Sequence, residues 1–537
     1  MGSMLNIASR MEGPEQKTII GKIGVTVSAK GIANGTSVYI NDGADFGPDT
    51  KLGATTLGQY GPPFTVTLGF AEAIEYAQSN GIGKISSLPA NKYVFTSPLY
   101  LNPNGTYTNS LEIDGHGSIF TYPSSSTFDL IQVSNNPNNT TGQPMYPIEI
   151  HGFLFDGAGS TNYNGIHFNQ YGNSSSDPTV KISIHDNVFR NGFFQHVVFD
   201  NASNSIDVFD NVFINPAGGG CVYINGSDFP PIVRNNFFIA GALSAGSNAV
   251  GFQNNENSST TLGAFSGGYV LANYFTNLSD APTSNLSGAI EFGNGTTSGW
   301  NGCIIENNIL NLTAGWVNSV EEIGGIADNI IVSKNIFQTN ATIVLSGQRN
   351  DCSENIFLNG CTTFEHFRFS RNTVYQPTSL QFGLSVNAGT AYTEVSENYF
   401  INNSTVSGNA AIQWTSSTTG SQPWVINDNV FAGSSTGTIN FGTATLSQFI
   451  SVQNNRGAIY QPTTPTVPTS GTAQTNDNPY SVNVYIYGGT ITAIDYTPAG
   501  GAAIEVGTTG PATVKLNPGD SITLTYSAAP SWKWTTA

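Results

Sequence analysis

Two neighbouring stretches, KISIHDNVFRNG from Lys181 to Gly192 and SIDVFDNVFINP from Ser205 to Pro216, share the signature Asp-Asn-Val-Phe. Related signatures recur along the chain, each with an asparagine at the same place. The repeated asparagines are Asn187, Asn211, Asn236, Asn273, Asn308, Asn335, Asn355, Asn372, Asn398 and Asn429. Their spacing of roughly 17 to 37 residues is typical of a solenoid.

The segments before these asparagines have the alternation of β-strands. The residues five and three positions before each asparagine are mostly apolar with a polar residue between, as in Ile182 and Ile184. This period of two argues against helical repeats. Because strands of neighbouring coils lie about 4.8 Å apart, the stacked asparagines can form an internal ladder of amide hydrogen bonds. We therefore predict an all-β fold, a parallel β-helix.

A second series of strand-like segments lies between the asparagines: GIHFNQ, HVVFDN, CVYING, AVGFQN, AIEFGN, TIVLSG, AIQWTS and TINFGT. In each segment the second and fourth residues, such as Ile166 and Phe168, point to one side and the third points to the other. The third and fifth positions should therefore form an outer surface. Its members include His167, Tyr223, Glu291, Asn169, Asp200, Asn225 and Gln253.

Composition limits the classes of partner. The chain has 537 residues, a formal charge of −18 and only 10% charged residues, and its 32 Phe and 22 Tyr supply enough apolar surface for a folded core. Such an acidic surface makes nucleic acid and anionic membranes poor partners, and no stretch is long enough for membrane insertion.

The four cysteines do not form a disulfide framework, since Cys303 and Cys352 fall on inward positions and should be buried free thiols.

The chain divides into four parts. Residues 1–40 form an N-terminal extension with a strand in KIGVTVSA, and residues 41–457 form the β-helix. Residues 458–479 form a Pro/Thr-rich linker, and residues 480–537 contain short strands typical of a small β-sandwich. Within the second part, TLGFAEAIEYAQSNGIG predicts an amphipathic helix that covers the open end of the first coil. Its apolar face is Phe70, Ile74 and Ala77, with Thr67 as N-cap and Gly81 at the end.

The start of the β-helix is similar to the N-terminal module of the pectate-lyase-like superfamily. The resemblance rests on an Asp-Phe-Gly stretch (Asp45 to Asp49), the capping helix, a Leu-Pro-Ala-x-x-Tyr strand (Leu88 to Tyr93) and a Gly-x-Gly turn (Gly115 to Gly117). With the coils it extends over roughly residues 40 to 460. It implies a right-handed parallel β-helix. The superfamily includes polysaccharide lyases, glycoside hydrolases, epimerases and phage tailspikes, so the resemblance does not select one activity.

The better-known site patterns of that superfamily are missing. Of the polygalacturonase-like patterns the chain has only Gly115-His116-Gly117, which we interpret as a turn before the coils begin. The clustered aspartates for Ca²⁺ and the nearby Arg or Lys base of a pectate lyase are not recognisable either. We expect no cofactor and no metal ligands, with Ca²⁺ a possibility only for a lyase.

Several charges have a structural explanation. One charged series lies immediately before the ladder asparagines: Lys334, Glu354, Arg371, Glu397 and Asp428. Another lies four positions before them: Asp351, Arg368 and Glu394. The signs alternate between neighbouring coils until the last, since Glu397 and Asp428 are both acidic. The residues of opposite charge, like Asp156 with Arg190, should therefore form ion pairs on the outside of the coils.

A candidate catalytic site lies where the repeat spacing lengthens, between Asn236 and Asn308. Insertions on one side of a solenoid usually build the wall of a binding groove. Glu291 lies between two of these loops, and Glu321 or Glu322 on the next coil would place a second carboxylate about 5 Å away, as in a retaining glycosidase. The alternative is that these are solvated loop acids.

The candidate substrate-binding residues surround these acids in the sequence. They are Tyr223, Asp228, Gln253, Trp300 and Trp316. For the two tryptophans, anchoring in the core or in a loop is an alternative to sugar stacking.

The sequence thus predicts an extracellular carbohydrate-active enzyme, a glycoside hydrolase or polysaccharide lyase that cleaves a polysaccharide along the β-helix. The alternatives are a non-catalytic or virion-associated tailspike-like β-helix and a surface adhesin. The expected partner is a polysaccharide, and the expected state is a monomer or homotrimer. Trimers without sugar release would favour the tailspike-like alternative.

Overall fold

The structure is a computed structural model of the 537-residue chain. It describes residues 25–27, 69–70, 73–74, 77, 81–101, 110–134, 147–160, 162–169, 181–202, 205–214, 219–227, 229–240, 248–253, 267–277, 288–293, 300–312, 318–322, 327–345, 347, 349–364, 367–387, 392–414, 424–433, 437–440, 449–459, 462, 464–478 and 480–537. The chain forms two compact units, of which the first comprises residues 1–268 and 278–285 and the second comprises residues 269–277 and 286–537.

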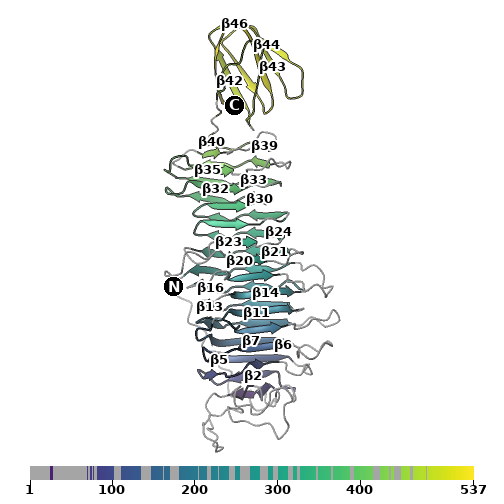
Figure 1. Cartoon of the computed structure of the whole chain (residues 1–537), viewed down its shortest axis with the longest axis vertical. Helices are drawn as coiled ribbons and strands as arrows, with labels where there is room; N and C mark the ends of the chain where they lie inside the picture. Colours follow the sequence, from purple (N-terminus) through teal and green to yellow (C-terminus); the bar gives the residue numbers. More distant parts are fainter. Residues whose placement is uncertain are drawn as a thin grey trace, which may run out of the picture. The chain divides into compact units, whose positions relative to one another are not determined.

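The first unit contains strands of two parallel sheets, here called sheet A and sheet B (Figure 1). Its sheet A strands are β1 (Val25–Val27), β2 (Lys84–Ser87), β3 (Lys92–Val94), β5 (Leu111–Thr121), β7 (Ile148–Asp156), β9 (Lys181–His185), β10 (Val188–Arg190), β12 (Ser205–Phe209), β13 (Val212–Ile214), β15 (Ile232–Arg234) and β16 (Phe237–Ala240). Its sheet B strands are β4 (Leu99–Tyr100), β6 (Ile131–Ser134), β8 (Ile166–Asn169), β11 (Gln195–Ala202), β14 (Gly220–Ser227) and β17 (Val250–Gln253).

The second unit repeats this arrangement. Its sheet A strands are β18 (Tyr269–Leu271), β19 (Tyr274–Asn277), β21 (Trp300–Glu306), β22 (Ile309–Asn311), β24 (Ala327–Ser333), β25 (Ile336–Phe337), β27 (Asn350–Ser353), β28 (Ile356–Phe357), β30 (Phe367–Ser370), β31 (Thr373–Gln376), β33 (Thr393–Ser396), β34 (Tyr399–Asn402), β36 (Trp424–Asn427), β37 (Val430–Ala432) and β39 (Phe449–Gln453). Its sheet B strands are β20 (Gly288–Gly293), β23 (Asn318–Glu322), β26 (Ala341–Val344), β29 (Cys361–Phe364), β32 (Phe382–Asn387), β35 (Ala410–Trp414), β38 (Gly437–Asn440) and β40 (Ala458–Ile459).

The parallel register confirms the predicted β-helix. In the first unit β8, β11, β14 and β17 pair in parallel, and Ile166, Val197, Val222 and Val250 occupy equivalent positions. These side chains are fully buried. Phenylalanines at the equivalent position of sheet A stack across coils: the ring centroids of Phe155, Phe189, Phe213 and Phe238 are successively 4.6, 5.0 and 5.1 Å apart. The core is thus a column of like residues, as the repeat predicts.

The asparagine ladder is also confirmed. Asn355 is fully buried; its Nδ2 donates to the carbonyl of Val332 on the preceding coil (2.8 Å) and to Oδ1 of Asn372 on the next (3.0 Å). The backbone N–H of Asn355 donates to the same Oδ1 (2.9 Å). The pattern recurs along the second unit and ends on Asn455, a further position that the sequence repeat did not indicate. Each turn therefore satisfies its buried polar groups through the same side chain.

The residue before each ladder asparagine has a left-handed backbone conformation. Lys334, Glu354, Arg371 and Glu397 have φ between 54° and 60°. Non-glycine residues rarely adopt this conformation, and here it lies at the turn between two strands of one coil. These side chains therefore project from a tight corner, where charges stack in the predicted order.

The predicted ion pairs form. Arg371 contacts both Glu354 (3.2 Å) and Glu397 (3.7 Å). Arg368 lies between Asp351 (4.0 Å) and Glu394 (3.8 Å), and Arg190 contacts Asp156 (3.0 Å). One detail differs from the prediction, since Lys334 pairs with Glu306 at 2.5 Å rather than with Glu354.

Replacing Arg371 with Met is expected to lower the free energy of unfolding by less than about 1 kcal/mol and to leave activity unchanged. The side chain is 41% exposed, so solvent screens most of the interaction, but its loss leaves Glu354 and Glu397 as stacked like charges. Urea unfolding measures the effect, with exposed Lys92→Met as control. A loss of activity at unchanged stability would contradict the structural role.

The structure describes a few residues of the predicted N-terminal helix. Phe70, Ala73, Ile74 and Ala77 are helical and buried, and the Phe70 ring meets that of Tyr93 edge-on at 5.0 Å. Ile82 N–H donates to Ala77 O (2.7 Å), next to Gly81 at a φ of 67°, as at a glycine-terminated helix end. Thr67, the rest of the predicted helix and Asp45 to Asp49 lie outside the described residues.

Two smaller expectations also have clear outcomes. The Gly115-His116-Gly117 turn is a register shift inside β5, where His116 and Gly117 have φ of 44° and 75°. The four cysteines, Cys221, Cys303, Cys352 and Cys361, are free and buried, as predicted for Cys303 and Cys352.

In the part of the chain that the structure describes, no helix has the length and apolar character that crossing a membrane would need.

The C-terminal strands form two antiparallel sheets around one core. The strands are β41 (Ala473–Thr475), β42 (Val482–Tyr487), β43 (Thr490–Thr497), β44 (Ile504–Gly507), β45 (Ala512–Leu516), β46 (Ser521–Ala528) and β47 (Ser531–Thr536). One sheet has the order β41-β46-β43-β44 and the other β45-β42-β47. Their shared core includes Val484, Ile494, Leu524 and Trp534.

Part of the predicted linker belongs to these sheets. β41 lies within residues 458–479 and pairs with β46, and Trp532 Nε1 donates to the carbonyl of Pro465 (2.7 Å). Residues 464–537, here called the C-terminal module, therefore begin earlier than the sequence composition indicated, because hydrogen bonds to distant strands order the Pro/Thr-rich segment.

Candidate functional site

The structure settles the register of the two acidic coils. β20 and β23 pair in parallel in sheet B, with Glu291 opposite Glu321 and Phe292 opposite Glu322. Equivalent positions in a parallel sheet point to the same face, and neighbouring strands lie about 4.8 Å apart. Glu321 rather than Glu322 is thus the register partner of Glu291.

Both acids are withdrawn from solvent. Glu291 is only 6% exposed. Its neighbours Ile290 and Phe292, which point to the opposite face of the strand, are also buried, so both faces of the strand are covered here. Glu321 is half-buried, and its Oε2 is buried without a hydrogen-bond partner among the described residues. Two carboxylates at this spacing repel each other when both are ionised, so the pair favours holding a proton.

The surroundings of Glu321 favour its protonated form. Burial raises the pKa of Glu321, and this effect exceeds the opposing hydrogen bonds from the Asn318 side chain and the Gly288 backbone N–H. Glu321 packs closely against Gly288. This contact requires glycine, because a Cβ at position 288 would lie 2.8 Å from the Glu321 Cβ. Glu321 is therefore a carboxyl group that favours its protonated form, beside a second carboxyl group in the same register row.

One of the two predicted tryptophans, Trp300, is described, and it is buried. Trp300 begins β21 of sheet A, opposite Ala327, and is 3% exposed, which agrees with the alternative of core anchoring. Trp316 and Asp228 lie outside the described residues, and the side chains of Glu322 and Gln253 are likewise not described.

Tyr223 lies on the outer face of sheet B in the first unit. It shares one row across the strands with Gln132, His167, Val198 and Gly251. Tyr223 is half-buried. Polar and aromatic side chains on this face are of the kind that hydrogen-bond and pack against sugars.

An imidazole bridge on this face escaped the sequence prediction. His167 contacts Asp129 through Nδ1 (2.6 Å) and Asp200 through Nε2 (2.8 Å), and Asn225 Nδ2 donates to Asp200 Oδ1 (3.1 Å). Burial alone would lower the pKa of His167, but the bonds and charges of the two aspartates together raise it to about 9. His167 is thus a cation at neutral pH that joins three coils, with both ring nitrogens engaged.

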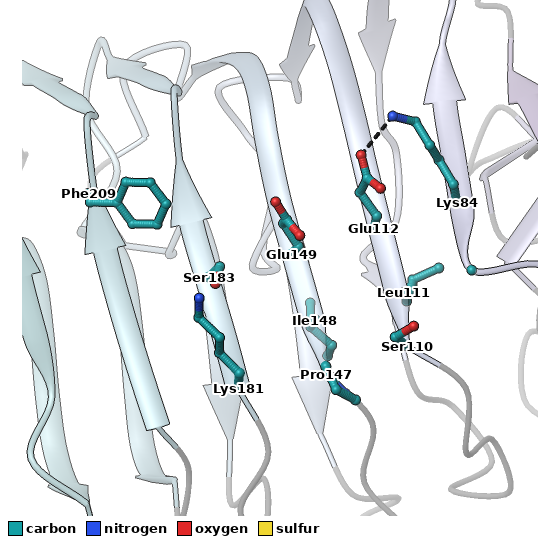
Figure 2. Close-up of a pocket in the computed structure, with 11 residues that line it drawn as sticks. Lys84, Ser110, Leu111, Glu112, Pro147, Ile148, Glu149, Lys181, Ser183 and Phe209 are labelled. Atoms are coloured by element: carbon teal, nitrogen blue, oxygen red, sulfur yellow. Dashed lines mark hydrogen bonds and ion pairs between the residues drawn. The ribbon is translucent and has the colours of Figure 1, made fainter.

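Sheet A of the first unit has a pocket of about 430 Å³ on its outer face. Figure 2 shows Glu112 and Glu149 on neighbouring strands of this pocket, with Lys181, Ser183 and Phe209 on the strands beyond. Lys84 contacts Glu112 (2.7 Å), and His185 contacts Glu149 (2.7 Å). Of the four charged residues in the lining, Lys84, Glu112 and Glu149 therefore already have partners.

One group in this region could hold a metal ion. Ligand atoms of Glu112, Asp114 and His151 lie within 4.8 Å of one another. Lys84 contacts both Glu112 and Asp114, at 2.7 and 3.0 Å, so its ammonium group already supplies a positive charge there. The bond from His151, with the contact from Lys84, lowers the pKa of Glu112 to about 2 against the effect of burial. A divalent cation would have to displace Lys84.

Stacked rings extend from this cluster along sheet A. His151 and His185 stack at a centroid distance of 4.8 Å, and His185 stacks on Phe209 at 4.5 Å. The guanidinium group of Arg234 lies 4.1 Å from the Phe209 centroid and pairs with Asp207 (3.0 Å). Both faces of the Phe209 ring are covered by protein, so this column stabilises the coils and offers no open ring face to a sugar.

Comparisons with known proteins find similarity in architecture only. No protein-family model and no curated protein matches the sequence. The tailspike protein of Escherichia coli bacteriophage HK620, solved in complex with a pentasaccharide, is similar over 87% of this chain and 88% of its own, with 13% identity and a TM-score of 0.43. The A-module of the mannuronan C-5 epimerase AlgE6 of Azotobacter vinelandii is similar over 73% of this chain and 95% of its own, with 12% identity and a TM-score of 0.36. The strand register, rather than these likenesses, makes the chain a parallel β-helix protein.

Proposed function

We propose that the chain is an extracellular carbohydrate-active enzyme that hydrolyses a polysaccharide on the outer face of sheet B, with Glu291 and Glu321 as its catalytic pair. The observation that supports this proposal is their register: two adjacent carboxyl groups on one face, of which Glu321 has a raised pKa. A retaining glycosidase needs two carboxyl groups about 5 Å apart, one protonated and one ionised.

The roles follow from the environments. Glu321 donates its proton to the glycosidic oxygen as the bond to the leaving sugar breaks. Ionised Glu291 attacks the anomeric carbon, and water then hydrolyses the glycosyl-enzyme with Glu321 now acting as base. Hydrolysis is favoured over elimination because these two acids provide no base of the Arg or Lys type that abstracts a proton next to a uronate.

A panel of polysaccharides tests the proposal. Hydrolysis predicts new reducing ends without the ultraviolet absorbance of an unsaturated uronate, and activity that survives EDTA. Absorbing products that vanish with EDTA would instead identify a Ca²⁺-dependent lyase and overturn the assignment. The products must also disappear in Glu291→Gln.

One observation favours a non-catalytic, tailspike-like or adhesin function. Glu291 is 6% exposed, and a catalytic carboxylate must reach the substrate. Light scattering together with the panel distinguishes the two functions: homotrimers that bind polysaccharide without releasing sugar would support the second.

A further inference from the structure

The outer face of the three-stranded sheet in the C-terminal module carries two exposed tyrosines. β42 buries Val482, Val484 and Ile486 against the core, so the residues between them point outward. Tyr485 is 43% exposed and Tyr487 is 50% exposed. Two residues apart on one strand, their Cα atoms are about 7 Å apart and both side chains point to the same face.

Lysines flank this pair on both neighbouring strands. Lys533 of β47 lies opposite Tyr485, and Lys515 of β45 lies opposite Asn483, one outward position away. Both lysines are exposed, and they are the only basic residues among residues 461–537. We call Tyr485, Tyr487, Lys515 and Lys533 the tyrosine face.

The acids of the module lie elsewhere. Asp495 and Glu505 belong to β43 and β44 of the other sheet, and Asp520 is buried, where it accepts a hydrogen bond from Tyr496 Oη (2.7 Å). Asp477 follows β41 and precedes β42. Both positive charges of the module are thus gathered on one face of a chain whose net charge is −18.

The end of the tyrosine face is open. Two glycines, Gly488 and Gly489, follow Tyr487 with φ of 70° and 67° and form the turn to β43. A Cβ added to Gly488 would meet nothing within 4 Å. No side chain at this turn shields Tyr487, so an elongated ligand could lie across both rings.

We propose that the tyrosine face is a binding site for an acidic polysaccharide, separate from the catalytic pair proposed above. Exposed aromatic rings offer an apolar surface for the C–H faces of pyranose rings and a hydroxyl for hydrogen bonding. The two ammonium groups beside them pair with carboxylate groups of uronate or sialate units. In so acidic a chain, this local positive charge is what lets a polyanion approach.

Two other occupants fit the face less well. Tight binding of nucleic acid requires several phosphates to be neutralised, and two lysines on a chain of net charge −18 do not provide that. A second copy of the chain would bury the tyrosines in a homo-oligomer, so it makes a distinct prediction about mass.

The test measures binding by the full chain carrying Glu291→Gln, so that the result does not depend on cleavage. The probes are polygalacturonate, alginate and polysialate, with dextran as the neutral control, in affinity electrophoresis. At least one acidic probe should retard the protein, and Tyr485→Ser with Tyr487→Ser should weaken that binding by about tenfold or more. Lys515→Gln with Lys533→Gln should weaken it and reduce its sensitivity to salt.

Ile504→Ser is the matched control, because Ile504 is 53% exposed but lies on β44 of the other sheet. It should bind like the parent. The proposal fails if none of the three acidic probes binds, if the tyrosine variant binds as tightly as the parent, or if Ile504→Ser loses as much affinity. A lower oligomeric mass in the tyrosine variant would also overturn the proposal, in favour of self-association. So would binding of single-stranded DNA by the parent that the tyrosine variant loses to the same extent as it loses binding of the acidic polysaccharide.

Discussion

Replacing Glu291 with Gln is expected to abolish polysaccharide turnover while leaving sugar binding and the melting temperature nearly unchanged. Glutamine keeps the shape of the side chain between Ile290 and Phe292 but cannot form a glycosyl-enzyme. Because Glu291 is only 6% exposed, removing its charge also removes a desolvation cost, so no loss of stability is expected. Initial rates on the most active polysaccharide of the panel, with thermal melts, measure both effects.

Glu321→Gln provides the companion measurement. Loss of a general acid should lower the rate by about 10²- to 10⁴-fold. Because the pKa of Glu321 is raised in the folded chain, this group favours folding at low pH and opposes it as pH rises through its pKa. Glu321→Gln should therefore raise the melting temperature relative to the parent at neutral pH, but not at low pH.

Glu354→Gln is the control for both variants, since Glu354 is exposed in an ion pair with Arg371 and should keep full activity. Full activity in Glu291→Gln would contradict the assigned site. Attention would then move to the preceding coils, where Tyr223 and Asp200 lie and where Asp228 remains a sequence-based candidate.

The fold was predictable because its signals are local and repeated. An asparagine at one position of every coil, such as Asn355, requires a partner of the same type above and below, and the structure provides it in Asn335 and Asn372. Alternation at Ile166 and Phe168 likewise identifies the inward face of sheet B. The left-handed backbone of the preceding residue was not predictable, because charged residues such as Arg371 rarely adopt it.

The candidate site was predictable only in part. Glu291 was recognised as an outward strand residue, but its register with Glu321 depends on the length of the intervening coil, which no local pattern determines. The clusters in the first unit were missed for a related reason. Glu112, Asp114 and His151 lie on β5 and β7, before the first ladder asparagine, so the repeat does not align them.

Asp129, a partner of His167, precedes β6 and is not at a ladder position. The same limit applies to the Pro/Thr-rich segment. Its composition indicates a linker, whereas its hydrogen bonds come from Tyr526 and Trp532, about 60 residues later in the sequence.

Replacing His167 with Gln is expected to lower the free energy of unfolding of the first unit by about 3 kcal/mol near pH 6. This magnitude follows from the rise of the pKa of His167 from 6.5 to about 9 on folding. The imidazolium ion stabilises Asp129 and Asp200, and glutamine leaves these two carboxylates without a cation between them. Because the folded-state pKa lies above the unfolded value, the contribution is complete below about pH 6.5 and declines as pH rises towards about 9.

Urea unfolding of the parent and of His167→Gln at several pH values between about 5.5 and 9.5 measures this contribution as the difference between the two free energies. The difference should be largest at the acidic end and should shrink as pH rises. His116→Gln is the control. His116 is 47% exposed, and among the described residues its only ion-pair partner is Asp114. If the difference for His167→Gln were the same at every pH, the pKa of His167 would be equal in the folded and unfolded chain, which would contradict the raised pKa assigned to the bridge.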